Sequence, residues 1–392
     1  MPGARPLAAV PVPRPSDSLS GAGGTAPAPD RPHNRGRLRA WAELLRVSAL
    51  FSVPGDALAG AAAVGRPGRG TALAIGASLC LYEAGMTLND WADREEDALD
   101  RPHRPIPSGR VAPGAALAAA GVLTAAGLAL ASRAGRPALA VASGLAATVW
   151  AYDLHLKHTK LGPAAMASAR ALDLMLGATA TATPRTRAGS RPVAAEAPGR
   201  GGEAPGASRS GNRPAILVRP HQATRSSGAA RPLRSALPSA LVLGAHTYAV
   251  TAVSRHEAQG GSSAAPLAAL AGVAALAAAV LRARPSSPGG RGTPGTRVGS
   301  ADSGPPEVPS GSGRLLLPAF TGSYLRTSAI PLLHAALNPS PPLTQRAVGG
   351  GIRAMIPLQA ALAARAGAPV NGLAVMGLVP LARALARKVS PT

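Results

Sequence analysis

The sequence predicts an all-α membrane protein, a polytopic bundle of transmembrane helices. Three observations lead to this fold class. Hydrophobic residues make up 46% of the 392-residue chain and charged residues only 15%, well below the roughly 25% usual in soluble domains. The apolar residues are mostly Ala, Leu, Val and Gly, and the chain has just two Phe, four Tyr and three Trp. Small side chains let helices approach closely in a bilayer, so this composition suits a lipid-embedded bundle.

Apolar segments long enough to cross a bilayer recur along the chain, and a transmembrane helix needs about 20 such residues. We place ten candidates near 41–64, 71–92, 113–133, 137–155, 163–183, 235–254, 264–283, 315–337, 347–365 and 369–387. Several are marginal because Ala contributes little to membrane insertion. The last two can also be read as one span followed by a surface helix.

Three stretches rich in Pro, Gly, Ser and Arg divide the chain. Residues 1–39 are predicted to form a disordered N-terminal tail, and residues 40–388 a single membrane domain. Two low-complexity loops, 184–234 and 284–313, interrupt that domain, and the first of them holds ten Arg without any hydrophobic period. We expect these stretches to be disordered because they cannot bury enough apolar surface to fold.

An acidic motif ends the second predicted span. Asn89, Asp93 and Asp97 are spaced four residues apart, so they project from one face of a helix. Asp90 and Asp100 flank this row. Several acids at the end of an apolar helix repel one another and are costly to desolvate. A divalent cation removes that cost, and Mg²⁺ prefers such oxygen ligands. The pattern predicts a magnesium site at Asn89, Asp90, Asp93 and Asp97; the alternative is a solvated, charged helix end.

A loop stiffened by Pro follows the acidic motif directly. It carries Arg101, Arg104 and Arg110 within the run RPHRPIPSGR. Arg pairs with phosphate oxygens through its planar fork of donors. An acidic row followed by an Arg loop therefore indicates a diphosphate-binding site, with Arg101 and Arg104 as substrate-binding residues.

The run from Asn89 to Arg110 resembles the first signature of the UbiA prenyltransferase superfamily, Asn-Asp-x-x-Asp-x-x-x-Asp followed by Arg-Pro-x-Arg-Pro-Ile-Pro-Ser-Gly. The order of apolar spans is similar as well, so the resemblance extends over 40–388 apart from the two loops. It implies a bundle of about nine transmembrane helices around a central cavity. It also implies Mg²⁺-dependent transfer of a prenyl group from an isoprenoid diphosphate to an acceptor. Within the family, the chain looks closest to a branch found in high-GC Gram-positive bacteria.

Further polar residues lie within or beside the predicted spans. Lys157 matches a family Lys that contacts the diphosphate; the alternative is an anchor on the cytoplasmic side. Arg46 matches a cavity-facing family Arg; the alternative is snorkelling to the interface. Arg170 and Asp173 are three residues apart inside the fifth span, where ionisable residues are by default functional or paired. For these two, a structural ion pair and a contact to the acceptor both remain open.

The second family motif is incomplete in this chain. The family usually has two acids four residues apart at the end of the sixth span, the second of them four residues before a Gly. Here Glu257 lies four residues before Gly261 and stands for the second acid, whereas Val253 occupies the position of the first. A second Mg²⁺ would therefore have fewer ligands. As a hypothesis, Arg255 replaces the missing positive charge by binding the diphosphate directly.

These features together predict an integral-membrane prenyltransferase. Mg²⁺ would neutralise charge on the leaving diphosphate, basic side chains would add preorganised positive charge, and the apolar cavity would exclude water. The expected catalytic residues are Asp93, Asp97, Lys157, Arg255 and Glu257. The expected partners are the prenyl diphosphate, the bilayer and an unidentified acceptor. The alternatives are a UbiA-type terpene cyclase, and a non-catalytic component that binds or transports prenyl lipids, which the incomplete second motif favours.

The net charge of +23 raises the possibility of nucleic-acid binding. The basic residues are nearly all Arg, many of them in Pro- and Gly-rich stretches, and no aromatic residues are interleaved with them for stacking on bases. We therefore expect no nucleic-acid partner. Arg35, Arg37 and Arg39 precede the first span, which favours a cytoplasmic N-terminus. Alternation of the spans then predicts a multi-pass protein of the cell membrane whose acidic motifs face the cytoplasm.

Overall fold

The computed structural model describes residues 31–46, 52–182, 227–256, 262–282 and 312–389, and within these ranges the chain is helical without any strand. The helices are, in order, α1 (Arg31–Leu44), α2 (Val53–Ala62), α3 (Arg69–Ala92), α4 (Arg94–Asp100), α5 (Pro113–Ala134), α6 (Arg136–Ala151), the π-helical turn η2 (Tyr152–Leu156), α7 (Gly162–Ala182), α8 (Ser227–Ser254), α9 (Ala264–Arg282), α10 (Ser312–Leu337), α11 (Pro341–Arg365) and α12 (Pro369–Val389). The predicted all-α fold class is confirmed.

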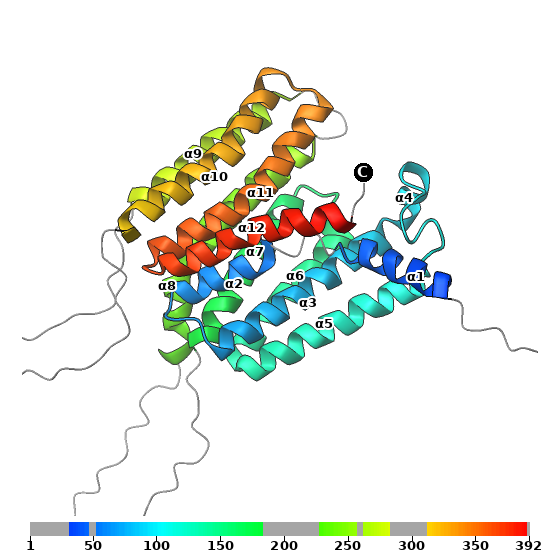
Figure 1. The fold of residues 1–392 in the computed structure, drawn as a ribbon, viewed down its shortest axis with the longest axis horizontal. Coiled ribbons are helices and arrows are strands. Elements are labelled where there is room, and N and C mark those ends of the chain that lie inside the picture. The colour runs from blue at the N-terminus through cyan, green and yellow to red at the C-terminus, as the bar shows by residue number, and fades with distance from the viewer. Residues whose placement is uncertain (1–30, 47–51, 183–226, 257–261, 283–311, 390–392) are drawn as a thin grey trace, which may run out of the picture.

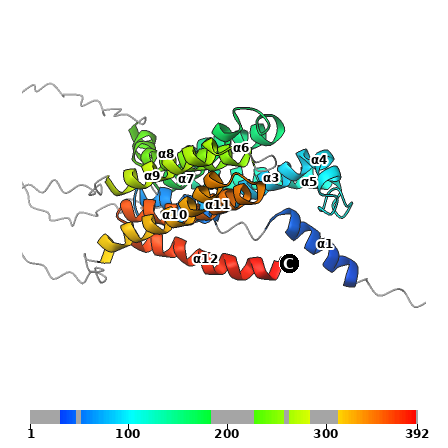
Figure 2. The ribbon, with the colours of Figure 1, turned by 90° about the horizontal axis from the view of Figure 1, so that it is seen from above.

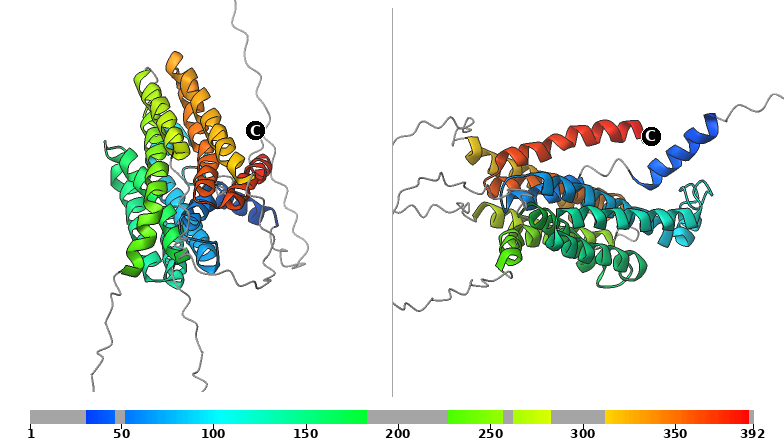
Figure 3. Two further views of the ribbon diagram at one scale, coloured as in Figure 1. Left: turned by 90° about the vertical axis from the view of Figure 1, so that its left-hand side faces the viewer. Right: turned by 90° about the horizontal axis from the view of Figure 1, so that it is seen from below.

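The longer helices lie side by side in one elongated bundle (Figures 1 and 2). The short helices α1 and α4 lie together at one end of this bundle (Figure 1), and α12 runs along its outside (Figure 3). The end marked by α1 and α4 is called the mouth end below. It also carries the loop that joins η2 to α7, because η2 follows the same end of α6.

Six of the described helical stretches are long and apolar enough to cross a membrane, which makes this a multi-pass membrane protein. They are Arg69–Ala92, Pro113–Ala134, Arg136–Leu156, Arg231–Ser254, Ala264–Arg282 and Pro341–Arg365. The helices α7, α10 and α12 fall on three more of the predicted spans. Thus every predicted span after the first coincides with a helix, to within eight residues at each end.

The first predicted span, 41–64, is wrong as a single helix. Helix α1 ends at Leu44 and α2 begins at Val53. Arg46 has a left-handed backbone with φ of 44°, a conformation that cannot continue a right-handed helix. Pro54 then lies in the first turn of α2, where its missing N–H costs no hydrogen bond. An apolar run alone did not reveal this interruption.

The predicted disordered stretches are partly helical. Helix α1 begins at Arg31, inside the predicted tail 1–39, because Ala40 and Leu44 pack against Ile106 and Val111. Such packing stabilises helices that are too short to persist alone. The starts of α8 and α10 likewise overlap the ends of the predicted loops 184–234 and 284–313. The other residues of the tail and of both loops lie outside the described ranges.

Close packing of α7 against α2 and α3 depends on glycine. A Cβ atom on Gly60 would lie 2.0 Å from the carbonyl oxygen of Leu174, and one on Gly177 would lie 2.3 Å from that of Ala57. On α3, a Cβ atom on Gly70 would meet the α7 backbone at 2.0 Å. These helices therefore touch through their backbones, as small residues allow in membrane bundles.

Candidate active site

A cavity of about 280 Å³ lies between α3, α6 and α7, next to the mouth end. It is polar at both ends and mostly apolar between them. Its lining residues are Arg46, Ser78, Leu81, Tyr82, Gly85, Met86, Asn89, Leu145, Val149, Tyr152, Asp153, Met166, Ala169, Arg170 and Asp173. An internal cavity with a few convergent polar groups is the usual form of a small-molecule site.

The acidic motif does not form one continuous row. Helix α3 ends at Ala92, Asp93 adopts φ of −85° and ψ of 2°, and α4 begins at Arg94. This turn groups the predicted ligands in two pairs instead of a single line. The amide nitrogen Nδ2 of Asn89 donates to Oδ2 of Asp93 at 3.2 Å. Asp97 and Asp90 form the second pair, because both carboxylates contact Arg104. Asp90 is therefore as much a part of the site as Asp97.

Lys157 joins the first of these pairs. Its Nζ atom donates to Oδ1 of Asn89 at 3.3 Å and forms an ion pair with Asp93. Lys157 directly follows the π-helical turn η2, and its own backbone N–H bonds to the carbonyl oxygen of Tyr152 at 3.0 Å. Such π turns re-aim side chains and often occur at functional sites. The buried carboxyl of Asp153 comes from the same turn and faces the cavity.

Three Arg residues surround the second pair. Arg104 Nη1 donates to Oδ2 of Asp97 at 2.6 Å and to Oδ1 of Asp90 at 3.3 Å. Arg46 Nη2 reaches the same Oδ1 of Asp90 at 3.0 Å, and Arg101 Nη1 reaches Oδ1 of Asp97 at 3.4 Å. Both carboxylates are almost fully buried, where an unpaired charge would be strongly destabilising.

The mouth of the cavity is therefore an interlocked set of opposite charges. Four of the six predicted basic site residues contact carboxylates of the motif, namely Arg46, Arg101, Arg104 and Lys157. We call this set of cations and carboxylates the mouth cluster. Arg101 is the most exposed cation, with 55% of its side chain accessible, whereas Lys157 is only 10% accessible. A polyanionic ligand at this place would meet several donors at once.

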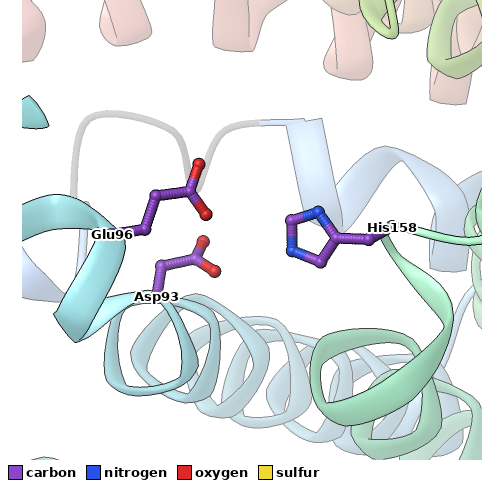
Figure 4. Close-up of side chains that lie close together, drawn as sticks. All are labelled: Asp93, Glu96 and His158. Carbon is purple, nitrogen blue, oxygen red and sulfur yellow. The ribbon is translucent and has the colours of Figure 1, made fainter.

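A group with the geometry of a metal site includes two residues that the sequence did not indicate. One ligand atom each from Asp93, Glu96 and His158 lies within 4.8 Å of the other two. Figure 4 shows both carboxylates turned toward the His158 ring. The oxygen atoms suit Mg²⁺, whereas the imidazole suits transition metals better. His158 was missed because the turn before α7 brings it to α4 from a distant part of the sequence.

The second motif is only partly described. Arg255 is exposed and its Nη1 donates to the carbonyl oxygen of Thr159 at 2.5 Å. It thus fixes the loop that carries Lys157 and His158 to the end of α8. Val253, which replaces the first acid of the motif, is buried. Glu257 lies outside the described residues, so its predicted role stays a prediction.

A second polar group closes the inner end of the cavity. Arg170 Nη1 donates to Oδ2 of Asp56 at 2.6 Å. The ion pair thus involves Asp56 of α2, and not Asp173 as the spacing on α7 suggested. Asp173 instead accepts a hydrogen bond from the Ser78 hydroxyl. Gln359 of α11 donates to Oδ1 of Asp56 at 2.6 Å. The sequence spacing gave no signal for Asp56 or Gln359.

An exposed ion pair connects α1 to the Arg loop. Arg110 Nη1 donates to Oε2 of Glu43 at 2.7 Å, and its Nη2 bonds to the carbonyl oxygen of His103 at 2.5 Å. The hydrogen bond from Arg110 lowers the pKa of the Glu43 carboxyl below its usual 4.5. Arg110 therefore holds α1 on the loop in this structure and does not point to the mouth cluster.

The chain is similar in sequence to known proteins. Residues 48–195 match the model of the UbiA prenyltransferase family. The digeranylgeranylglyceryl phosphate synthase of Ignicoccus hospitalis is 36% identical over 148 residues, which cover 38% of this chain and 49% of that protein. The chain thus spans about half the length of that relative.

The chain is also similar in fold to a solved structure. The apo structure of a UbiA homolog from Aeropyrum pernix K1 has a TM-score of 0.51 at 15% identity, covering 80% of this chain and 96% of that one. A UbiA homolog from Archaeoglobus fulgidus, solved with GPP and Mg²⁺, has a TM-score of 0.49 at 16% identity, covering 86% and 99%.

Proposed function

We propose, from the match of residues 48–195 to the model of the UbiA prenyltransferase family, that the protein is an integral-membrane prenyltransferase. It would move a prenyl group from an isoprenoid diphosphate to an acceptor. The mouth cluster beside a largely apolar cavity is the observation that carries this proposal. A prenyl diphosphate has the complementary form, with a polyanionic head and an apolar tail.

The metal would be Mg²⁺, held at the mouth by Asn89, Asp93 and Glu96, with Asp90 and Asp97 beside them. These side chains offer carboxylate and amide oxygens, the ligands that Mg²⁺ prefers, and Mg²⁺ usually takes further ligands from substrate phosphates. When bound, it would neutralise charge on the departing diphosphate. Asp93 is central because it belongs both to the pair with Asn89 and to the group with Glu96.

The basic residues of the mouth cluster would bind the diphosphate. Arg46, Arg104 and Lys157 each turn from a carboxylate to a phosphate oxygen, and Arg101 reaches in from the exposed rim. Preorganised donors of this kind stabilise the charge that develops on a leaving group. Arg255 acts indirectly, by holding the Thr159 carbonyl and with it the loop of Lys157.

The cavity would hold the tail and the reacting carbon. The bond between the allylic carbon and the diphosphate oxygen breaks, and its electron pair leaves with the diphosphate. A nucleophilic atom of the acceptor then bonds to that carbon and loses its proton. Asp153 is our candidate for the group that takes the proton, because it lines the cavity one turn before Lys157. The apolar walls exclude water, which would otherwise capture the carbocation.

The acceptor and the orientation are part of the proposal. The name of the Ignicoccus relative points to a glyceryl phosphate lipid, so a lipid alcohol of this class is the first acceptor to test. Residues 40–388 would form one membrane domain with its mouth end in the cytoplasm. The basic side chains Arg37, Arg101, Arg104 and Lys160 lie at or near that end, as expected for the cytoplasmic side.

The direct test uses the full chain in lipid nanodiscs. It is incubated with labelled geranyl, farnesyl or geranylgeranyl diphosphate, with and without Mg²⁺, and diphosphate release is measured. We expect release that requires both Mg²⁺ and an added lipid acceptor. Release without any acceptor, together with a cyclic hydrocarbon product, would point to a terpene cyclase. Tight binding without release would point to a binding or transport component.

A further inference from the structure

The inner end of the cavity is built from charged and polar side chains. Arg170 and Asp173 line it from α7, and Ser78 and Tyr82 line it from α3. The Arg170 guanidinium lies 6.0 Å from the centre of the Tyr82 ring. Behind them, Asp56 pairs with Arg170, and Gln359 Nε2 bonds to Asp56 and to the backbone carbonyl of Ser52. We call Arg170, Asp173, Ser78 and Tyr82 the floor.

The floor is a short distance from the mouth. Tyr82 lies seven residues before Asn89 on α3, which is about 10 Å along the axis at 1.5 Å per residue. Ser78 lies one turn deeper, about 16 Å from Asn89. Met86, Val149 and Met166 line the cavity between the two ends. The apolar part of the cavity is therefore about 10 Å deep.

Below the floor, the described helices α2 and α7 are closely packed. Leu174 and Leu176 follow Asp173 on α7 and are fully buried. One turn further, α2 and α7 touch through their backbones at Gly60 and Gly177. Asp56 and Gln359 also link three helices behind the floor, α2, α7 and α11. A tail that reached the floor could not push past it without separating α2 from α7.

This geometry points to a role in substrate selection, and the argument rests on the proposed prenyltransferase function. We propose that the floor limits the donor to a short prenyl chain of about ten carbons. Each isoprene unit adds four carbon–carbon bonds of about 1.5 Å, and the zigzag of an extended chain shortens them to about 5 Å along its axis, so two units span about 10 Å. A third unit would press methyl groups against Arg170 and Asp173. Polar groups covered in this way lose hydrogen-bonding partners without gaining any, which is unfavourable.

The first measurement uses the unmodified full chain in nanodiscs with Mg²⁺. Labelled geranyl diphosphate is bound and then displaced by unlabelled geranyl, farnesyl or geranylgeranyl diphosphate, and by inorganic diphosphate as the head group alone. We expect geranyl diphosphate to bind about tenfold or more tightly than geranylgeranyl diphosphate, because the longer tail must leave the floor or fold back. Equal or tighter binding of geranylgeranyl diphosphate would overturn the inference.

A double variant and a control variant test whether the preference for a short donor depends on the floor. The double variant Asp56→Asn with Arg170→Met removes both charges together, which is tolerated better than removal of one partner. We expect the preference for the ten-carbon donor to shrink at least about threefold in this variant, because the floor loses its guanidinium and becomes less polar. Thr71→Val is the control. Thr71 of α3 pairs with Thr181 of α7 at 2.8 Å, so this variant also removes a polar contact between the two helices that carry the floor, but Thr71 does not line the cavity. An unchanged preference in the folded double variant would also overturn the inference.

The two proposals fail in different ways. If no prenyl diphosphate competes better than inorganic diphosphate, the cavity does not bind a prenyl tail, and the proposed function itself is wrong. If all three prenyl diphosphates bind equally well, the proposed function stands and only the role of the floor is wrong. Should the double variant fail to fold, the series of chain lengths on the unmodified protein decides the question.

Discussion

Arg104 and Asp97 form a short ion pair at the mouth of the cavity, with 2.6 Å between Nη1 of Arg104 and Oδ2 of Asp97. The same nitrogen lies 3.3 Å from Asp90. One guanidinium thus joins the end of α3 to α4 across the turn at Asp93. Because Asp97 and Asp90 are almost fully buried, water screens these contacts little. Arg104 therefore fixes how the two halves of the acidic motif face each other.

Replacing Arg104 should reduce activity strongly. We expect Arg104→Lys to lower Mg²⁺-dependent diphosphate release by about 10- to 100-fold, because a point charge on a flexible stem does not reproduce the planar guanidinium. Arg94→Lys is the control, since Arg94 packs on Trp91 and pairs with the exposed Glu95. Its activity should stay within about twofold. Equal losses in both variants would mean that Arg104 has no special place in the site.

The ligands of the metal can be identified by replacing an oxygen donor and a nitrogen donor in two separate variants. Asp93→Asn should lower Mg²⁺-dependent release by about 100-fold or more, because charge stabilisation at the leaving group is lost. His158→Gln should keep activity with Mg²⁺ within about twofold, because Mg²⁺ prefers oxygen ligands. Paramagnetic resonance of bound Mn²⁺ measures metal binding independently of turnover. A loss of Mn²⁺ binding in His158→Gln would make the imidazole a true ligand.

Arg255 should affect substrate affinity more than the chemical step. Its contact to the Thr159 carbonyl holds the loop that presents Lys157. We expect Arg255→Ala to raise KM for the prenyl diphosphate by about two- to tenfold, the effect of losing one exposed charged hydrogen bond, with kcat nearly unchanged. Arg255→Lys should recover part of the affinity. A large fall in kcat in Arg255→Ala would indicate direct contact with the leaving group.

Two glycine variants test the contact between α2 and α7. Gly177→Ala should lower the free energy of unfolding by about 1–3 kcal/mol, because the new Cβ atom would overlap the Ala57 backbone. Gly121→Ala on α5 meets nothing within 4 Å and should be neutral or stabilising by up to about 1 kcal/mol. Thermal unfolding in one detergent compares them. Similar stability of the two variants would contradict the close approach.

The attachment of α1 should depend on pH. The Glu43 carboxyl has a lowered pKa when Arg110 bonds to it, so this contact stabilises the folded form above pH 4.5 and is lost as the pH falls through the lowered pKa. Trp41 of α1 and Trp91 of α3 both pack against the apolar cluster that docks α1, so they report on docking by fluorescence in a Trp150→Phe background. Their signal should change below pH 4.5 in the unmodified chain and much less in Glu43→Gln. Glu95→Gln is the control.

Much of the fold could be predicted from local patterns, because a helix that crosses the membrane requires a continuous apolar segment of about 20 residues, which is visible in the sequence. The acidic motif and the Arg loop are contiguous, so their proximity at one helix end followed from chain connectivity. Lys157 was assigned to the mouth only through the family resemblance, and the structure does place it against Asp93. The turn at Asp93 itself was not foreseen, because the residues around it are compatible with an unbroken helix.

The contacts behind the floor were beyond sequence reasoning for a different reason. Arg170 and Asp173 share a helix face, which suggested a pair, but the partner of Arg170 lies 114 positions earlier. Gln359 bonds to Asp56 across 303 positions. Such contacts depend on which helices become neighbours, and that is decided by the packing of small residues such as Gly60 and Gly177. Periodicity within one helix contains no information about it.

The long sequence separation around Asp56 also has a consequence for how the protein is made. Helix α2 has ten residues, about 15 Å in length, and cannot span a hydrocarbon core of about 30 Å by itself. At about 5–20 residues per second, Gln359 leaves the ribosome roughly 15–60 s after Asp56. During that interval α2 is a half-length helix with an incompletely paired carboxylate. Its final position is therefore acquired late in biosynthesis, because the contact between Asp56 and Gln359 behind the cavity can form only after α11 has been made.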